Sequence, residues 1–390
     1  MLMLMAWANA PTLADRFALA RPCVANATAR RRRLGKTYQG FIKALLKHAD
    51  TLLEQLQTHL RTTLNKIAGK HWTRMGWLVF AIDGSKIDLP RTAAHEQAFG
   101  TSGKNNSGPQ LLLSVLWHLG TGLPWAWRIG SGRDSERQHL RDMLHHLPDG
   151  ALLLADAGYP GFDLLNTLIA QRIHVLMRVG GNITLLKKLG YAVREHEHTV
   201  YLWPHGKRDQ PPLTLRLIRV PGQEVVLITS VLDPRQLDDE QAAVMYKLRW
   251  GAEVGYRSLK QTLARRKMCS AAPRQAVAEL HGSMLGLTLL GLMSVAGIIE
   301  DGRDPLNWSV ALALRVVRQA MTHRPADRRR SLLRALAQAV KDDWQRKADK
   351  RARRWPHKKR DTPPGPPKVR AADARQVELA KQLRSRTAAA

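Results

Sequence analysis

Five short apolar runs and two amphipathic helices alternate between residues 77 and 179, and this order constrains the fold more than any other feature of the chain. The runs occupy residues 77–83, 110–118, 123–129, 151–156 and 173–179. Each has the length and composition of a buried strand and is bounded by turn residues. Ser135 with Gln138 forms a capping-box signal for a helix over 135–147, and a second helix covers 162–171. This order predicts an α/β fold in which helices pack against a mixed sheet.

Two of the apolar runs end in an aspartate, Asp83 and Asp156. Catalytic groups collect at the carboxyl ends of strands, where loops open outwards. Glu253, on a later predicted helix, supplies a third carboxylate that can reach the same place. Three converging carboxylates repel one another unless a cation neutralises them, and Mg²⁺ prefers oxygen ligands. We therefore expect these three residues to hold two Mg²⁺ ions about 4 Å apart, with Mn²⁺ as a substitute, for in-line phosphoryl displacement.

Glu253 belongs to a regular pattern, Tyr-x2-Arg-x3-Glu-x6-Lys, formed by Tyr246, Arg249, Glu253 and Lys260. We predict one helix from 241 to 267. On such a helix the four positions fall within roughly 60° of one another. One face would then carry a single carboxylate surrounded by cations and a tyrosine, which suits a metal ion beside a phosphate backbone.

Arg257 and Trp250 widen this stripe to about 100°. We expect Arg249, Arg257 and Lys260 to hold phosphates, because guanidinium and ammonium groups are the usual phosphate ligands. Tyr246 can donate to a phosphate oxygen, and Trp250 can stack on an unpaired base. The alternative is that the charged residues form ordinary i,i+4 ion pairs on an exposed helix.

The charge of the chain favours a polyanionic partner. Lys and Arg number 62 against 32 acids, for a formal net charge of +30 and a pI near 11.0. Nucleic acid is the commonest polyanion that such a protein binds. No RNA-binding RNP or KH pattern is present. The two cysteines provide neither a disulfide framework nor a thiolate zinc site, which fits a reducing cytoplasm.

The chain divides into five expected regions. They are a helical DNA-binding region over 1–75, a sheet domain over 76–179 and 234–270, a β-rich insertion over 180–233, a helical region over 271–345, and a basic Pro-rich tail over 346–390 that we expect to be disordered. The first region contains Arg30-Arg31-Arg32-Arg33, suited to phosphates. The apolar start lacks a basic n-region, so we expect a helix start or an over-long reading frame. The apolar run 280–299 predicts a buried core helix, not a membrane span.

Together these motifs resemble the DDE transposases of bacterial insertion sequences, in particular the insertion sequence 4 family. The first-aspartate motif AIDGS, the second LLADAGYPG and all four signature positions match, and the resemblance runs from about 77 to 267. Arg178 in VLMRVGGN resembles the basic residue that ends the following strand in that family. The resemblance implies a ribonuclease-H-like fold with a β-rich insertion between the second aspartate and the glutamate.

The resemblance also implies the chemistry and the role of each residue. Asp83, Asp156 and Glu253 would hold Mg²⁺, while the DNA contacts would come from Tyr246, Arg249, Lys260 and Arg178. The implied reaction is hydrolysis of the phosphodiester at a transposon end, after which the freed 3′-hydroxyl attacks target DNA. The implied partners are double-stranded DNA, at terminal inverted repeats and at the target, and a second copy of the chain on that DNA. A cytoplasmic, nucleoid-associated bacterial protein without membrane contact is expected.

Two alternatives remain open on the sequence. The same carboxylates would serve a metal-dependent nuclease without strand transfer. An inactive transposase-derived protein could act as a DNA-binding repressor, although it would have no need of an intact set of carboxylates and signature.

Overall fold

The structure is a computed structural model that describes residues 1–27, 35–102, 108–180, 190–193, 199–202, 213–220, 225–322 and 328–341, with isolated positions between 370 and 382. The chain forms two compact units, which are described separately. The first unit is Met1–His146 with Arg249–Lys341, and the second is Leu147–Leu248 with Asp342–Ala390. The Arg30–Arg33 block and almost all of the predicted tail lie outside the described residues.

The sheet of the first unit is an antiparallel meander of three strands. They are β1 (Val79–Asp88), β2 (Gln110–His118) and β3 (Leu123–Ser131). The three predicted strands are confirmed, but the predicted end of the first at Asp83 is wrong. The strand continues because Gly84 to Asp88 still pair with β2, and the fully buried Ile87 anchors this half in the core. Asp83 therefore lies in the middle of β1, opposite Val115.

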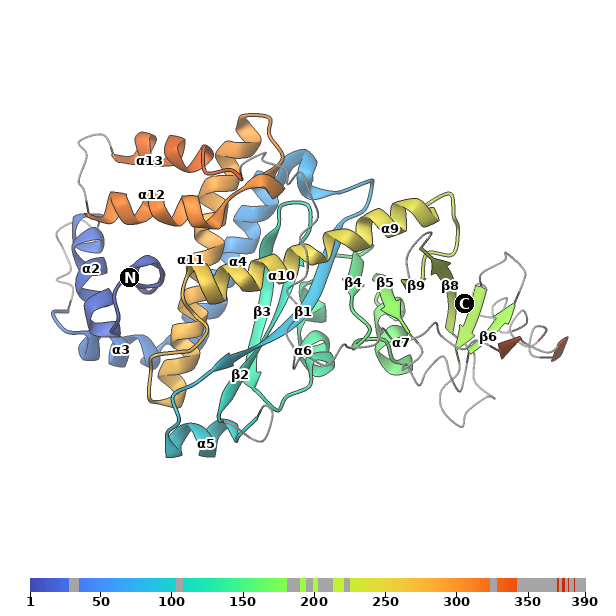
Figure 1. Cartoon of the computed structure of the whole chain (residues 1–390), viewed down its shortest axis with the longest axis horizontal. Helices are drawn as coiled ribbons and strands as arrows, with labels where there is room; N and C mark the ends of the chain where they lie inside the picture. The colour runs from blue at the N-terminus through green and yellow to red at the C-terminus, as the bar shows by residue number, and fades with distance from the viewer. Residues whose placement is uncertain are drawn as a thin grey trace, which may run out of the picture. The chain divides into compact units, whose positions relative to one another are not determined.

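Helices from both ends of the chain and from its middle complete the first unit (Figure 1). They are α1 (Leu2–Trp7), α2 (Leu13–Ala27), α3 (Tyr38–Lys47), α4 (Ala49–Ala68), α5 (Ala93–Phe99), α6 (Glu136–Met143), α10 (Trp250–Arg257), α11 (Pro273–Glu300), α12 (Val310–Thr322) and α13 (Arg328–Ala337), with short 3-10 turns η1 (Gly69–Trp72), η3 (Leu144–His146) and η6 (Pro305–Asn307). The helical character predicted for both ends of the chain is confirmed in the described residues. α11 is long and apolar enough to cross a membrane, but 72% of its most apolar window is buried inside the protein, which confirms the prediction of a core helix.

Two helices pack on opposite faces of the meander. On one face, the Ser114 hydroxyl of β2 lies 3.0 Å from Nδ1 of His139 in α6. On the other face, Gly255 of α10 approaches the ring of Trp117 so closely that a Cβ there would lie 2.3 Å from it. Ser135 is the N-cap of α6 as predicted, but the predicted capping box is wrong. The Ser135 side chain makes no capping bond, and Gln138 donates forward to Asp142 at 2.9 Å.

The second unit begins with two parallel strands joined by a helix. β4 (Leu152–Ala155) pairs with β5 (His174–Val179), and α7 (Phe162–Ala170) connects them. β5 continues into antiparallel strands in the order β5-β9-β8-β7-β6, with β10 beside β6. Their bounds are β6 (Gly190–Val193), β7 (Thr199–Leu202), β8 (Leu213–Arg219), β9 (Val226–Thr229) and β10 (Arg370–Ala371). The strands predicted between 180 and 233 are thus confirmed where they are described. α9 (Asp239–Leu248) closes this unit.

Candidate active site

An open groove of about 280 Å³ lies in the first unit between β1 and α10, and it contains two of the three predicted metal-binding carboxylates. Its walls are formed by Asp83, Gly84, Ser85, Glu253, Tyr256, Arg257, Lys260 and Gln261. Asp83 comes from the middle of β1 and Glu253 from α10, 170 positions apart in sequence numbering. The fold therefore brings together two acids and two cations that the sequence separates widely.

Tyr256 fixes α10 against the strand that carries Asp83. Its hydroxyl lies 2.7 Å from the Asp83 carbonyl oxygen and 3.1 Å from that of Leu113, on two neighbouring strands. A hydroxyl has one proton to donate, so the two carbonyls share it. The Asp83 side chain is held locally, because its Oδ1 accepts from the Gly84 amide at 2.9 Å. The backbone at Asp83 and the helix that bears Glu253 are thus joined by a direct contact.

Glu253 is oriented by Arg249, whose Nη2 donates to its Oε1 at 3.1 Å. This is the i,i+4 ion pair that the sequence left open as an alternative. It does not lie on a fully exposed surface, since the two side chains are only 15% and 34% exposed. Arg257 is exposed and lines the groove, as expected of a phosphate ligand. Trp250 is 55% exposed and is not among the residues that line the groove.

The single helix predicted from 241 to 267 is wrong. α9 ends at Leu248, α10 begins at Trp250, and a π-helical turn, η5 (Ser258–Thr262), follows it. Beyond Arg257 the bonding changes to i→i+5, with the Leu263 amide donating to the Ser258 carbonyl at 3.0 Å. The π turn is followed by Ala264, whose left-handed φ of 55° ends the helical segment. The face calculated for an ideal helix therefore does not describe Lys260, which lies in the π turn.

Lys260 nevertheless reaches the groove. Burial lowers the pKa of its ammonium group below the usual value, an effect that the charge of Asp88 opposes and that of Arg266 reinforces. A half-buried ammonium has lost part of its hydration, so a bound anion would replace lost water contacts. π-helical turns are frequent at functional sites, and this one places a cation at the rim of the groove.

The remaining predicted residues belong to the second unit. Asp156 follows directly after β4, which confirms its predicted position at a strand end, and its Oδ1 accepts from the Gly158 amide at 2.8 Å. Arg178 lies on β5, one position beyond Met177, which pairs with Ala155 of β4. Asp156 and Arg178 therefore share the carboxyl ends of two neighbouring parallel strands. Tyr246 lies half-buried in α9.

The chemistry of the groove suits a hard cation. Asp83 and Glu253 offer carboxylate oxygens only, and no sulfur or imidazole ligand lines the groove, which favours Mg²⁺ or Mn²⁺ over zinc. Within neither unit do three His, Cys, Asp or Glu side chains of the described residues gather closely enough to form a complete metal site. The two carboxylates of the groove thus fit part of a metal site.

Residues 76–289, more than half of the chain, match the family described as the transposase DDE domain. The chain belongs to the DDE transposases. It is also 29% identical over 237 residues to the transposase InsG for insertion sequence element IS4 of Escherichia coli (strain K12), which covers 56% of this chain and 52% of InsG. The chain therefore spans about half the length of that curated relative, and within the family it is of the IS4 type.

Two solved transposase structures are also similar to this transposase. One is the piggyBac transposase synaptic complex with hairpin DNA, with a TM-score of 0.40 and 13% identity over 70% of this chain and 59% of the other. The second is the Mos1 transposase paired-end complex with left transposon end, with a TM-score of 0.19 and 13% identity over 42% and 52% of the two chains.

Four residues that line the transposase groove were not predicted as site residues from the sequence, namely Gly84, Ser85, Tyr256 and Gln261. A signal for Tyr256 was present, because it lies three residues after Glu253, on the adjacent side of the same helix. Ser85 follows Asp83 by two positions, so it projects to the same face of β1. Gln261 carried no signal, since the π turn that brings it to the groove is not visible in the sequence pattern.

Proposed function

We propose that this transposase cleaves DNA at the terminal inverted repeats of its insertion sequence and joins the freed 3′-hydroxyl to target DNA. The observation that carries the proposal is the groove in which Asp83 and Glu253 lie with Arg257 and Lys260. Acids for a metal and cations for phosphates in one open groove are the two requirements of metal-assisted phosphoryl transfer. A groove open to solvent also admits a duplex, which an enclosed pocket would not.

We further propose that the catalytic fold is ribonuclease-H-like. The antiparallel meander β1-β2-β3 in the first unit and the parallel pair β4-α7-β5 in the second support this topology. The strands from β6 to β9 would be the insertion between the second aspartate and the glutamate. The N-terminal helices would form the DNA-binding region, and a second copy of the chain would join the complex on paired ends.

The metal ligands are proposed to be Asp83, Glu253 and Asp156, the last on the ground of its motif and its position at a strand end. When bound, Mg²⁺ ions would lower the pKa of an attacking water and stabilise charge on the leaving oxygen. Arg249 keeps the Glu253 carboxylate in one orientation through its 3.1 Å contact. This preorganisation matters because reorienting a ligand during the reaction would raise the barrier.

The DNA contacts are proposed to come from the cations around these acids. Lys260 and Arg257 line the groove and would hold phosphates flanking the scissile bond. Trp250, exposed on α10, would stack on an unpaired base beside the cut. Tyr246, Arg249 and Arg178 are assigned to phosphates through the resemblance. In the second unit, Arg178 and Asp156 each follow directly after the last residue pair of β4 and β5, Ala155 with Met177. These contacts would act on chromosomal DNA in the bacterial cytoplasm.

Substitution of the three acids tests the site. Asp83→Asn, Asp156→Asn and Glu253→Gln should each abolish Mg²⁺-dependent cleavage of a duplex that carries the end of the element. The sequence of that end is taken from the DNA that flanks the gene. Binding of the same duplex should persist. Matched controls are Glu300→Gln, exposed at the end of α11 in the first unit, and Asp163→Asn, exposed in the first turn of α7 in the second. Normal cleavage by any of the three site variants would remove that residue from the assignment.

Two further assays separate the alternatives. A nuclease without strand transfer would cut the end but would not join a pre-cleaved 3′-hydroxyl end to a plasmid target. A DNA-binding repressor would bind the end and neither cut nor join in Mg²⁺ or Mn²⁺. The transposase should do all three, and loss of joining in Glu253→Gln would show that both steps use one site.

A further inference from the structure

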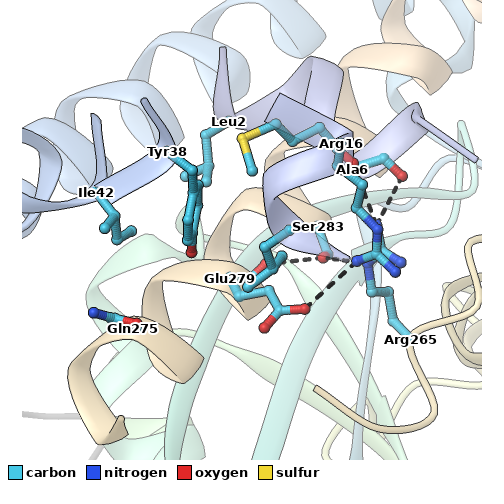
Figure 2. Close-up of a pocket in the computed structure, with 11 residues that line it drawn as sticks. Leu2, Ala6, Arg16, Tyr38, Ile42, Arg265, Gln275, Glu279 and Ser283 are labelled. Atoms are coloured by element: carbon cyan, nitrogen blue, oxygen red, sulfur yellow. Dashed lines mark hydrogen bonds and ion pairs between the residues drawn. The ribbon is translucent and has the colours of Figure 1, made fainter. Parts of the chain in front are cut away.

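A buried arginine, Arg265, lies at the junction between the signature segment and the N-terminal helices. It is 3% exposed and belongs to the short segment that follows the π turn. Its Nε donates to the Ser283 hydroxyl of α11 at 3.0 Å, and its Nη2 donates to the Ala6 carbonyl of α1 at 3.1 Å. Figure 2 shows Arg265 between Ala6 and Ser283, with Arg16 and Glu279 beside it. One side chain therefore joins its own segment to α1 and to α11.

The same residue secures the π turn that carries Lys260. The Arg265 amide donates to the Leu259 carbonyl at 3.1 Å, and its Nη1 donates to the Leu263 carbonyl at 2.8 Å. Between them, Ala264 holds its left-handed φ of 55°, a conformation that L-residues adopt at an energetic cost. A strained turn persists only where its surroundings enforce it, and here the enforcing contacts are those of Arg265.

Two kinds of contact hold α1 in place: close packing against α11, and hydrogen bonds that the last carbonyls of α1 accept from Arg265. A Cβ on Gly282 would lie 2.3 Å from Leu2, and one on Gly286 would lie 2.8 Å from the Ala6 Cβ, so these glycines allow the two helices to approach. The carbonyls at a helix C-terminus lack helical partners and carry partial negative charge. Arg265 binds two of them, Met5 at 3.5 Å and Ala6 at 3.1 Å, so its charge is balanced by the end of α1.

The cavity in this cluster is not a second substrate site. Its volume of about 20 Å³, between Arg16, Arg265 and Glu279, is enough for one water molecule. The Glu279 carboxylate is already occupied, since it accepts from the Cys269 and Ser270 amides and from the Ser270 hydroxyl. The cluster is therefore a structural junction, and its importance lies in what it holds in place.

We propose that Arg265 is a positioning residue that couples the seating of α1 to the placement of Lys260 in the catalytic groove. When α1 is docked, Arg265 holds the left-handed turn and the π turn closed, and Lys260 points into the groove. When α1 is displaced, the buried guanidinium loses two acceptors and the turn loses its support. The N-terminal helices would thereby control DNA cleavage through Lys260. The inference rests on the proposed function, since it assumes that Lys260 holds DNA at the cleavage site.

A double-mutant cycle tests the coupling. Arg265→Met should slow single-turnover cleavage of the end duplex by about 10- to 100-fold, because a shift of about 1 Å in a positioning group has effects of that size. Lys260→Ala should slow it by a similar factor. The double variant should be no slower than Lys260→Ala alone, since residues that act through one another are not additive. Gly286→Val, which unseats α1 without touching Arg265, should show the same non-additivity.

The matched control is Arg74→Met. Arg74 forms a partly buried ion pair with Asp304 in the same unit, and neither residue lines the groove. Arg74→Met should therefore lower the stability of the fold, and any effect that it has on the cleavage rate should multiply with that of Lys260→Ala. Arg265→Lys, which keeps the charge, replaces Arg265→Met in the cycle if the latter does not fold. Multiplicative effects of Arg265 and Lys260 would overturn the inference and leave the proposed function intact. Normal cleavage by Lys260→Ala would instead remove Lys260 from the proposed site, and the coupling with it.

Discussion

The Tyr256 hydroxyl is the contact whose removal should most directly separate stability from catalysis. Tyr256→Phe keeps the ring, which is 6% exposed and packs edge-on against Trp117 with centroids 5.8 Å apart, so no cavity forms. What is lost is the proton shared by the carbonyls of Asp83 and Leu113, at 2.7 and 3.1 Å. A buried hydrogen bond contributes about 1 kcal/mol net to the free energy of unfolding, and a buried carbonyl that loses this donor lowers that free energy by a similar amount. We expect a loss of about 2 kcal/mol and a Tm lower by roughly 4–8 °C.

The effect on cleavage should exceed the effect on stability. Without the hydroxyl, α10 is free to shift against β1, and the carboxylate of Glu253 moves relative to that of Asp83. A shift of about 1 Å can reduce the rate by about 100-fold, so we expect cleavage to slow by 10- to 100-fold. The assay is single-turnover cleavage of an end-labelled duplex at saturating Mg²⁺, well below the Tm of every variant. DNA binding, measured in parallel, should be unchanged because no cation of the groove is altered.

Thr121→Val is the control for this prediction. Thr121 is fully buried, and its hydroxyl lies 2.9 Å from Nδ1 of His118 in the turn beyond β2, outside the residues that line the groove. It should lower the Tm without slowing cleavage. Wild-type cleavage by Tyr256→Phe would refute the argument that this hydroxyl holds the site together. Equal slowing by both variants would show that the effect is general loss of stability.

Three further predictions concern stability. Gly255→Ala should lower the unfolding free energy by about 1–2 kcal/mol, because its Cβ would meet a buried tryptophan at 2.3 Å, whereas Gly251→Ala on the same helix, with nothing within 4 Å, should raise it by about 0.5–1 kcal/mol. Glu279→Gln should cost about 3 kcal/mol through its buried contacts, while Glu300→Gln at the exposed end of α11 should have no effect in urea denaturation. Burial lowers the pKa of His118 to about 4 in the folded protein. As the pH falls, this histidine is therefore protonated near pH 6.5 in the unfolded chain but only near pH 4 in the folded protein. Stability should therefore fall by up to about 3 kcal/mol between pH 6.5 and 4, and a His118→Gln variant should show a flatter profile; an unchanged slope would contradict the assignment.

The sequence predicted the strands better than the geometry of the segment that carries the Tyr-x2-Arg-x3-Glu-x6-Lys pattern. Apolar runs of strand length identify β1 to β5 because burial on both faces leaves a plain signal. The length of β1 was underestimated, since Asp83 to Lys86 are polar and only their pairing with β2 keeps them in the strand. The break at Arg249 and the π turn at Ser258 have no local signal. At the π turn, Arg265 bonds the carbonyls of Leu259 and Leu263, and the periodicity of the sequence does not predict such contacts.

α10 carries two interleaved stripes, and only one of them was visible as a motif. The charged stripe, Arg249, Glu253 and Arg257, repeats every four residues, and the last two line the groove. The packing stripe is Ala252, Gly255 and Tyr256, at the i, i+3, i+4 spacing of a helix face that packs against a core. The charged stripe cannot hold the helix against the sheet, because an i,i+4 ion pair joins residues of the same segment and contributes only a few tenths of a kcal/mol. The packing stripe supplies that energy, and its glycine sets how close the helix lies to β2. The distance between the carboxylates of Asp83 and Glu253 is therefore determined by residues that take no part in the chemistry, which explains why a four-residue signature identifies the family without specifying the geometry of its site.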